Sequence, residues 1–229
     1  MIDFERVSFA YANDIEALHD ITVHVDKGEF VFLVGPTGEG KSTLLKLIYR
    51  EIVPTSGRVI VAGTDVGPMP RRRVPFLRRR IGVVFQDFRL LSDKTIAENV
   101  WFALEVMAVP RRDMRRRTTE VLRQVGLGHR MDAFPAELSA GEQQRACIAR
   151  AIANYPPILL ADEPTGNLDP DTSLEIVMLL RDINIRGATV LMATHDKQVV
   201  DALNKRVISL HRGRIVRDVP QGFYYAACN

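Results

Sequence analysis

The sequence predicts an α/β fold in which helices cover both faces of a parallel sheet. Four continuous apolar runs support this prediction, VFLVG (31–35), IGVVFQ (81–86), ILLAD (158–162) and TVLMATH (189–195). Strands that are apolar throughout are buried on both faces, as in a parallel sheet between helices. Each run ends in a polar residue or a glycine turn. Because ligands bind beyond the carboxyl ends of such strands, we expect these four to bring their chemistry to one edge.

The remaining elements differ in their periodicity. IDFERVSF (2–9) alternates between apolar and polar residues and indicates a half-buried antiparallel strand, and residues 207–219 indicate a hairpin around Arg212 and Gly213. Between Gln86 and Pro156 the apolar spacing becomes helical, which predicts a helical lobe inserted into the sheet domain. The helix-spaced apolar residues are Ile96, Val100, Ala103, Leu104 and Met107, then Val121, Leu122 and Val125.

Composition limits the class of protein. With 229 residues, 46% of them hydrophobic, the chain can bury a sizeable core. No run of about 18 apolar residues is present, so we expect the chain not to cross a membrane by itself. The start MIDFER is charged where a signal peptide is apolar, which favours the cytosol. Cys147 and Cys228 lie far apart and form no metal-binding spacing, which fits a reducing compartment.

The formal charge is only +3, but the arginines are clustered at 71–73, 78–80, 111–112 and 115–117. The simplest interpretation is that they lie on solvated helix faces. The alternative is attraction to an anionic membrane surface or to nucleic acid. Because the arginines lack the repeated interleaved aromatic residues that nucleic-acid readers usually require, the membrane is the better of these two partners.

The segment GPTGEGKS (35–42) matches the phosphate-loop pattern G-x-x-x-x-G-K-[ST] between an apolar strand and a helix. Backbone N–H groups of such a loop surround the phosphates of a nucleotide, Lys41 reaches the β- and γ-phosphates, and Ser42 ligates Mg²⁺. We expect Glu39 to point outward to solvent, because a carboxylate repels a triphosphate. The expected ATP-binding residues of the loop are Gly35, Pro36, Thr37, Gly38, Glu39, Gly40, Lys41, Ser42 and Thr43.

The buried run ILLADEP (158–164) ends in two carboxylates. Asp162 suits the Mg²⁺ shell of a nucleotide site. Glu163, one residue further, suits a base that orients water for attack on the γ-phosphate. Together with the phosphate loop, this pair predicts hydrolysis of a γ-phosphate.

The order of five segments resembles the ATP-binding cassette (ABC) ATPases. These are the phosphate loop, FQDFRLL, LSAGEQQR, ILLADEPTGNLD and MATHD, and the resemblance covers essentially the whole chain. It implies a RecA-like core with an antiparallel β subdomain (1–86 and 157–229) and the helical lobe (87–156), in one domain. It also implies site residues: Gln86 contacts Mg²⁺ and the attacking water, His195 reaches the γ-phosphate, Asp169 belongs to a loop between subunits, and Tyr11 stacks on adenine.

LSAGEQQR (138–145) opens a helix whose first amides suit an anion. In the ABC ATPases the corresponding helix binds the γ-phosphate held by a second subunit, so that two chains enclose two ATP molecules. The resemblance implies an ATP-dependent homodimer, with Ser139, Ala140, Gly141 and Glu142 at the partner chain's ATP. Ala140 replaces the usual glycine, and its methyl group is tolerated where φ is negative.

Within this family the chain most resembles the ATPases of bacterial cell division. The resemblance implies an integral membrane partner at the division septum, peripheral attachment to the cytoplasmic side of the membrane, and control of peptidoglycan hydrolases outside it. The partner-facing groove is expected near 86–91 and 95–107. An alternative is the ATPase subunit of an exporter or importer, of the lipoprotein-release or macrolide-export type. A soluble cassette of DNA repair or translation is a third, but such proteins usually carry two cassettes or a coiled coil, so no nucleic acid is expected as partner.

Overall fold

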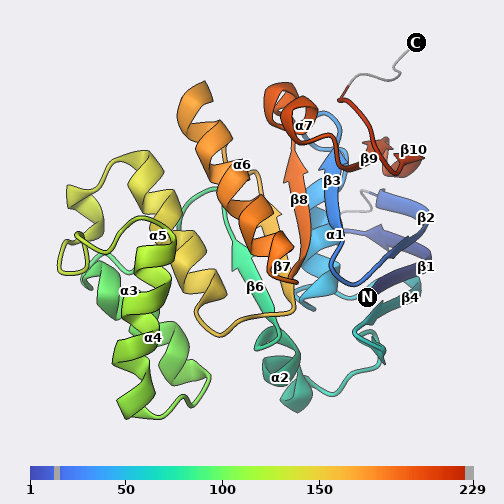
Figure 1. The fold of residues 1–229 in the computed structure, drawn as a ribbon. Helices are drawn as coiled ribbons and strands as arrows, with labels where there is room; N and C mark the ends of the chain where they lie inside the picture. The colour runs from blue at the N-terminus through green and yellow to red at the C-terminus, as the bar shows by residue number, and fades with distance from the viewer. Residues whose placement is uncertain (13–15, 225–229) are drawn as a thin grey trace.

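A computed structural model describes residues 1–12 and 16–224 and has a six-stranded sheet at its centre (Figure 1). The strand order is β10-β9-β3-β8-β7-β6, and β10 alone runs antiparallel to its neighbour. The strands are β3 (Phe30–Val34), β6 (Ile81–Val84), β7 (Ile158–Asp162), β8 (Thr189–Thr194), β9 (Arg206–His211) and β10 (Arg214–Val219). The four predicted parallel strands are therefore confirmed as neighbours, and the predicted hairpin is β9–β10.

The continuous apolar character of β3 follows from burial on both of its faces. Phe30, Phe32 and Val34 belong to the hydrophobic core beneath the lobe helices and α6. Val31 and Leu33 belong to a second core that includes α1 and the antiparallel sheet. Alternate side chains of a strand point to opposite faces, so neither face can carry polar residues here.

The second sheet is antiparallel and has the order β2-β1-β4-β5. Its strands are β1 (Ile2–Ala10), β2 (Glu16–Val25), β4 (Ser56–Val61) and β5 (Thr64–Asp65). The predicted alternation in β1 is confirmed, because Ile2, Phe4 and Val7 are buried while their neighbours are partly exposed. Helix α1 (Lys41–Ile48) contributes its apolar side chains to the core that these strands share with the central sheet.

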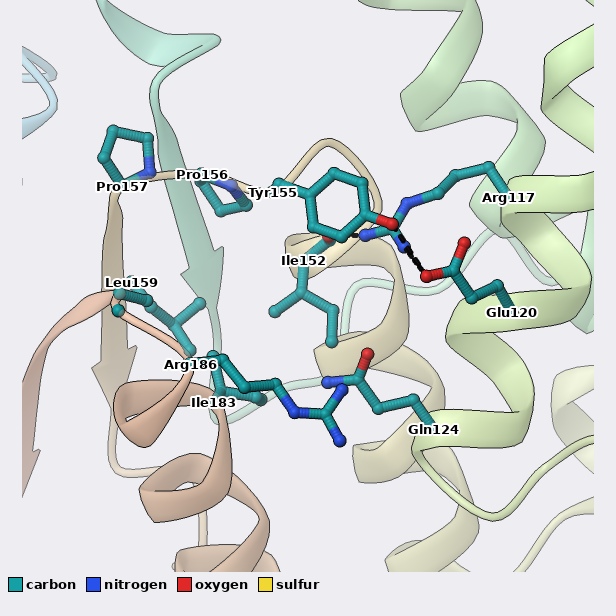
Figure 2. Close-up of a pocket in the computed structure, with 12 residues that line it drawn as sticks. Arg117, Glu120, Gln124, Ile152, Tyr155, Pro156, Pro157, Leu159, Ile183 and Arg186 are labelled. Atoms are coloured by element: carbon teal, nitrogen blue, oxygen red, sulfur yellow. Dashed lines mark hydrogen bonds and ion pairs between the residues drawn. The ribbon is translucent and has the colours of Figure 1, made fainter.

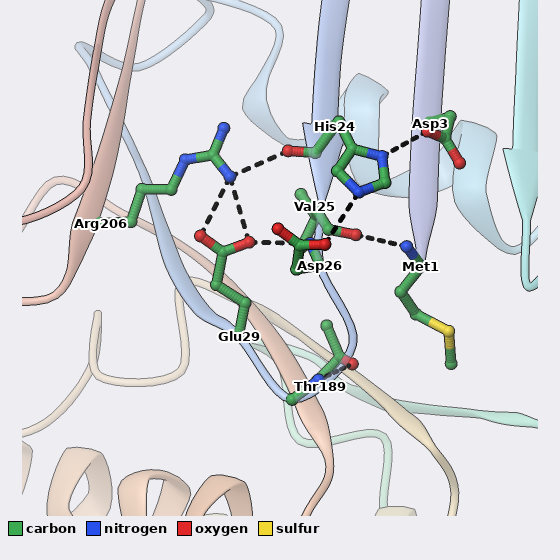
Figure 3. A network of polar contacts seen from close by, with 9 residues as sticks. Met1, Asp3, His24, Val25, Asp26, Glu29, Thr189 and Arg206 are labelled. Atoms are coloured by element: carbon green, nitrogen blue, oxygen red, sulfur yellow. Dashed lines mark hydrogen bonds and ion pairs between the residues drawn. The ribbon is translucent and has the colours of Figure 1, made fainter.

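Arg206 at the start of β9 joins the two sheets (Figure 3). Its Nη1 donates to the backbone carbonyl of His24 at 2.9 Å and to Glu29 Oε1 at 3.0 Å. Its other nitrogens bind the Asp218 carboxylate on β10 at 2.6 and 2.7 Å. These carboxylates raise the pKa of Arg206, so the cation remains charged in its half-buried position.

Helices α3 (Ile96–Val106), α4 (Arg111–Gln124) and α5 (Ala140–Ile152) lie between β6 and β7 in the chain, where helical spacing predicted them. They contact one another, and α5 also contacts β6 and α6. Thr95 and Glu98 form a reciprocal capping box at the start of α3. The remaining helices are α2 (Val74–Arg78), α6 (Pro170–Ile185) and α7 (Lys197–Leu203), with short 3₁₀ turns at Arg71–Arg73 and Pro135–Glu137.

The prediction that the clustered arginines are solvated is wrong for Arg117. This residue is only 6% exposed, and its side chain reaches from α4 to the end of α5, where it donates to the carbonyl of Ala153 at 2.7 Å. It also donates to the carbonyl of Ile152 at 3.1 Å (Figure 2). Its guanidinium stacks on the Tyr155 ring, whose hydroxyl donates to Glu120. These contacts form one wall of a cavity of about 320 Å³ at the amino ends of β7 and β8. Arg117 therefore fastens α4 to α5.

Within residues 1–12 and 16–224, none of the helices combines the length and the apolarity needed to span a membrane. Cys147 is buried as a free thiol, and Cys228 lies outside the described residues.

Candidate active site

The phosphate loop connects the end of β3 to the start of α1, as the sequence predicted. Two of its glycines are required by geometry. Gly35 (φ 146°) and Gly40 (φ 97°) have left-handed backbone, and a Cβ on either would lie within 2.5 Å of the carbonyl oxygen of Leu210 or Ala17. The loop therefore packs with its backbone against β2 and β9, which holds its amides in place.

Lys41 is the first residue of α1, at the end of this loop, and is only 5% exposed. Its Nζ donates to the carbonyls of Gly35 at 2.8 Å and Pro36 at 3.0 Å, and lies 3.4 Å from Glu163 Oε1. The ammonium group is therefore held over the loop by two carbonyls and one carboxylate. A triphosphate in the loop would meet a positive charge that is already desolvated.

Ser42 and Asp162 provide oxygen atoms suited to a divalent cation. Ser42 Oγ, in the first turn of α1, donates to Asp162 Oδ1, at the end of β7, at 2.8 Å. Burial raises the pKa of Asp162, and the hydrogen bond from Ser42 opposes this shift. In the described part of the chain no group of three His, Cys, Asp or Glu side chains could hold a metal ion. Mg²⁺ fits such a site, because it binds few protein oxygens and completes its shell with phosphates and water.

Glu163 directly follows β7, and its side chain contacts His195, the residue after β8. Its Oε2 accepts from the His195 backbone amide at 3.2 Å and lies 2.8 Å from His195 Nδ1, while Oε1 faces Lys41. Glu163 has φ 48°, a left-handed conformation that is unusual for a residue other than glycine and is concentrated at functional sites. The ends of β3, β7 and β8 thus bring a cation, a carboxylate and an imidazole together at one edge, as predicted from the four strand ends.

Gln86 lies two residues after β6 and joins the same edge. A Cβ on Gly166 would lie 2.9 Å from Gln86 Nε2, and Asn167 Nδ2 donates to the Gln86 carbonyl at 3.4 Å. The Gln86 amide is therefore packed against the loop that follows Glu163. The strand itself ends at Val84, slightly earlier than the apolar run suggested.

Tyr11 lies beside the start of α1. Its hydroxyl is 3.0 Å from Thr43 Oγ1, and its ring meets Phe9 edge-on at 4.9 Å between centroids. The ring is 38% exposed. An aromatic face is therefore available next to the phosphate loop, although residues 13–15, which follow it, lie outside the described residues.

The prediction that Glu39 points to solvent is wrong. Its side chain is 16% exposed and turns away from the loop toward the β9–β10 turn. Oε2 accepts a hydrogen bond from the Arg212 backbone amide, and Oε1 lies 3.5 Å from His211 Nδ1. The Glu39 carboxylate is thus kept away from a bound triphosphate by its contacts with Arg212 and His211, and not by solvation.

The start of α5 is closed by a reciprocal capping box. Ser139 Oγ accepts from the Glu142 amide at 3.3 Å, while Glu142 Oε2 accepts from the Ser139 amide at 2.9 Å. These hydrogen bonds lower the pKa of Glu142. Ala140 has no positive φ, so its methyl group causes no backbone strain. Close packing against α6 requires glycine at position 141, because a Cβ there would lie 2.6 Å from the Thr172 methyl group.

This helix start is remote from the chain's own phosphate loop. Figure 1 shows α5 in the helical lobe, with α6 and the strands β7 and β8 between it and α1. Ser139 and Ala140 are exposed. Asp169, at the start of α6, accepts from the Thr172 amide at 3.0 Å, which lowers the pKa of its exposed carboxyl group. Ser139 and Ala140 therefore form a second surface, separate from the Lys41–Glu163 cluster.

One connection was not predicted from the sequence. The carbonyl of Phe88, two residues after Gln86, accepts from Cys147 Sγ at 2.8 Å and from Arg150 Nη2 at 2.9 Å. Both donors lie on α5, which is capped by Ser139. No signal in the sequence could have indicated these contacts, because the partners are 59 and 62 residues apart. The Gln86 segment is thus bound directly to the helix of the second surface.

Comparisons with known proteins agree with this geometry. A family model described as "ABC transporter" matches residues 18–166. The chain is 51% identical over 224 residues to "Cell division ATP-binding protein FtsE" of Bacillus subtilis (strain 168), and 52% identical over 225 residues to the protein of that name from Mycobacterium tuberculosis (strain ATCC 25618 / H37Rv); each match covers 98% of both chains.

Solved structures similar to this chain are also ABC proteins by name. The "Dimeric structure of a post-hydrolysis state of the ATP-binding cassette MJ0796 bound to ADP and Pi" superposes with a TM-score of 0.86 and is 36% identical, covering 97% of this chain and 100% of that one. For "cbiO1 from clostridium perfringens: Part of the ABC transporter complex cbiONQ" the TM-score is 0.89 and the sequence identity is 31%. The match covers 96% of this chain and 88% of that one.

Proposed function

The chain belongs to the ABC transporter family and is an ATPase, and from this premise we propose that it is the ATP-hydrolysing subunit of a membrane complex acting in bacterial cell division. The observation that carries the catalytic part is the convergence of Lys41, Ser42, Asp162, Glu163 and His195 at one sheet edge. The cell-division role is supported by full-length similarity to proteins named FtsE.

The phosphate loop binds ATP through its backbone amides, and Lys41 exchanges its carbonyl partners for the β- and γ-phosphates. Ser42, Asp162 and Gln86 would hold Mg²⁺, which supplies charge stabilisation to the phosphates when bound. The exposed ring of Tyr11 stacks on adenine.

Glu163 orients the attacking water and accepts its proton, because its carboxylate lies next to the loop in which the γ-phosphate is bound. His195 and the His195 backbone amide hold this carboxylate in place from the end of β8. The imidazole, 54% exposed, can also reach the γ-phosphate. Hydrolysis then yields ADP and phosphate.

The second surface acts on another copy of the chain. Ser139, Ala140, Gly141 and Glu142 bind the ATP of the partner, and the loop at Asp169 joins the two copies. This proposal is supported by the exposed start of α5, its separation from α1 (Figure 1), and the dimers of MJ0796. One ATP is then enclosed by groups from both chains.

An FtsX-like integral membrane protein docks in a groove of about 590 Å³ between α3 and the strand β6. Phe102 and Val106 line it and are each 51% exposed, although both are apolar. The groove also includes Arg150, whose side chain binds the Phe88 carbonyl after Gln86. A partner docked in the groove can therefore move the Gln86 segment and α5 together. Through this contact the ATP cycle controls peptidoglycan hydrolases outside the membrane.

Mixing two inactive variants tests the shared site. Lys41→Ala does not hold nucleotide, while Ser139→Arg binds ATP but blocks the partner's γ-phosphate with a cation on a bulky side chain. A mixture contains heterodimers with one intact site, and we expect hydrolysis to return. The decisive measurement is on Ser139→Arg alone, because wild-type turnover in this variant would refute the shared site.

Co-purification from native membranes tests the partner. We expect the wild-type chain to retain an integral membrane protein and Phe102→Asp to lose it, because a charge in the groove must be desolvated on docking. Glu105→Lys, on the same helix but outside the groove lining, is the matched control. Equal retention by both variants would exclude this groove.

A further inference from the structure

We propose that the arginine face of α4, defined as Arg112, Arg115, Arg116 and Arg123, binds directly to the headgroups of an anionic phospholipid bilayer. These four residues recur at helical spacing and line one shallow depression together with Thr119 and Glu120. All four are exposed. This contact is additional to docking of the membrane partner, and it assigns a role to arginines that the ATPase site does not use.

The charge of α4 is not neutralised within the fold. Six of its 14 residues are arginine and two are acidic. Arg112 has one carboxylate nearby, Asp113 at 3.7 Å, and Glu120 binds Arg117 and Tyr155 instead. Among the residues that the structure describes, Arg115, Arg116 and Arg123 form no ion pair, although the charge of Arg116 acts on the nearby Glu120 carboxylate. The face therefore presents at least three unpaired cations to its surroundings.

These arginines also make α4 less stable. Arg112 and Arg116 are four residues apart, a spacing at which like charges repel each other on a helix. Arg112 lies in the first turn of α4, at the positive end of the helix dipole, where a cation is unfavourable. The helix is held by its opposite face, through Met114, Arg117 and the other buried residues. Because the arginine face does not stabilise the fold, an external anionic partner explains it better than solvation.

An exposed tryptophan adjoins this face. Trp101 on α3 is 42% exposed and lines a second depression together with Arg115. Tryptophan and arginine together are typical of surfaces that lie at the membrane–water interface. Phe102 and Val106, on the other side of α3, line the partner groove. The choice of a bilayer over other polyanions rests on the proposed function. When the membrane partner docks in that groove, α3 and α4 are kept beside the membrane.

Vesicle sedimentation of the purified full-length chain, without ATP or partner, tests this proposal. The probe is vesicles of phosphatidylcholine with about one-third phosphatidylglycerol, and pure phosphatidylcholine is the neutral control. We expect binding to the anionic vesicles only, weakening between about 0.05 and 0.5 M salt as the charges are screened. Each arginine at such a surface contributes roughly fivefold to binding, so Arg112→Gln, Arg115→Gln and Arg116→Gln together weaken it about 100-fold.

The matched control removes the same charge elsewhere. Arg71→Gln, Arg72→Gln and Arg73→Gln change three exposed arginines of a 3₁₀ turn, and we expect them to alter vesicle binding less than about threefold. An equal loss in both triple variants would show diffuse charge attraction and overturn the assignment to α4. Tighter binding of duplex DNA than of anionic vesicles would also overturn it, in favour of nucleic acid.

Trp101 gives an independent signal because it is the only tryptophan in the chain. Its fluorescence should shift to shorter wavelength with anionic vesicles and not with neutral ones, as the ring enters a less polar environment. Vesicle binding without this shift would place the contact elsewhere. Unchanged ATPase rates in the α4 variant would separate this test from the catalytic proposal.

Discussion

Replacing Glu163 with glutamine isolates the charge of this side chain, because carboxylate and amide have nearly the same shape. The carbonyl oxygen of the new side-chain amide can still accept from the His195 backbone amide, which is 3.2 Å from the present carboxylate. What is lost is the negative charge that faces Lys41 at 3.4 Å and the base that accepts a proton from water. The perturbation should therefore affect hydrolysis much more than folding.

The expected size follows from these contacts. A positioned general base contributes about 10²- to 10⁴-fold to a rate, so Glu163→Gln should raise the barrier by about 3–5 kcal/mol. ATP affinity should change less than about threefold, because the substitution leaves Lys41 and the loop amides, which hold the nucleotide, unchanged. The γ-phosphate also no longer competes with a carboxylate for the ammonium group. The variant should accumulate as a long-lived dimer with ATP bound.

The hydrolysis rate is measured by phosphate release, and the ATP affinity by binding of a fluorescent ATP analogue. Light scattering with Mg-ATP detects the dimer. The matched control is Glu39→Gln, a carboxylate in the same site that faces the β9–β10 turn and retains an acceptor for the Arg212 amide. We expect it to hydrolyse ATP at close to the wild-type rate. Wild-type turnover in Glu163→Gln would refute the role of this carboxylate, and loss of ATP binding would assign it a structural role.

Three further predictions concern single residues. Ala140→Gly should leave the ATP affinity of the monomer unchanged, since this residue faces the partner's nucleotide, and turnover should stay the same or rise; a large change in monomer affinity contradicts the assignment. Glu39→Ala should lower the free energy of unfolding by about 1 kcal/mol, because the Arg212 amide loses its acceptor. Thermal unfolding measures this, and a melting temperature equal to that of Glu39→Gln would contradict it. Burial raises the pKa of Cys147 to about 12, so in a Cys228→Ser background its thiol should react with a disulfide reagent at pH 8 far more slowly than after unfolding. Equal rates in the folded and unfolded states would show that the thiol is accessible.

Much of the active site could be predicted from the sequence because its signals are local. The phosphate loop needs glycines at fixed positions next to one lysine and one hydroxyl, and these are adjacent in the chain. The strands of the central sheet were recognisable because burial on both faces requires continuous apolar runs. Parallel strands place their carboxyl ends at one edge, so Asp162 and Glu163 could be assigned to the site of the phosphate loop before any distance was known. His195 was assigned to it only through the resemblance to the ABC ATPases.

Other features depend on contacts between distant residues, which no local pattern encodes. The direction of Glu39 is decided by the Arg212 amide on another element. Arg117 looks like its neighbours Arg115 and Arg116 in the sequence, but its position on the inner face of α4 buries it against the carbonyls at the end of α5.

The same division applies to the lobe as a whole. Its helices were predicted from their apolar spacing, which is a property of each segment alone. The hydrogen bonds from Cys147 and Arg150 to the Phe88 carbonyl exist only because packing of the lobe brings α5 against the segment after β6. The sequence by itself determined which groups this ATPase carries, because residue type and local spacing set their chemistry. The tertiary structure alone decided which of these groups are paired, because partners far apart in the chain meet only in the folded state.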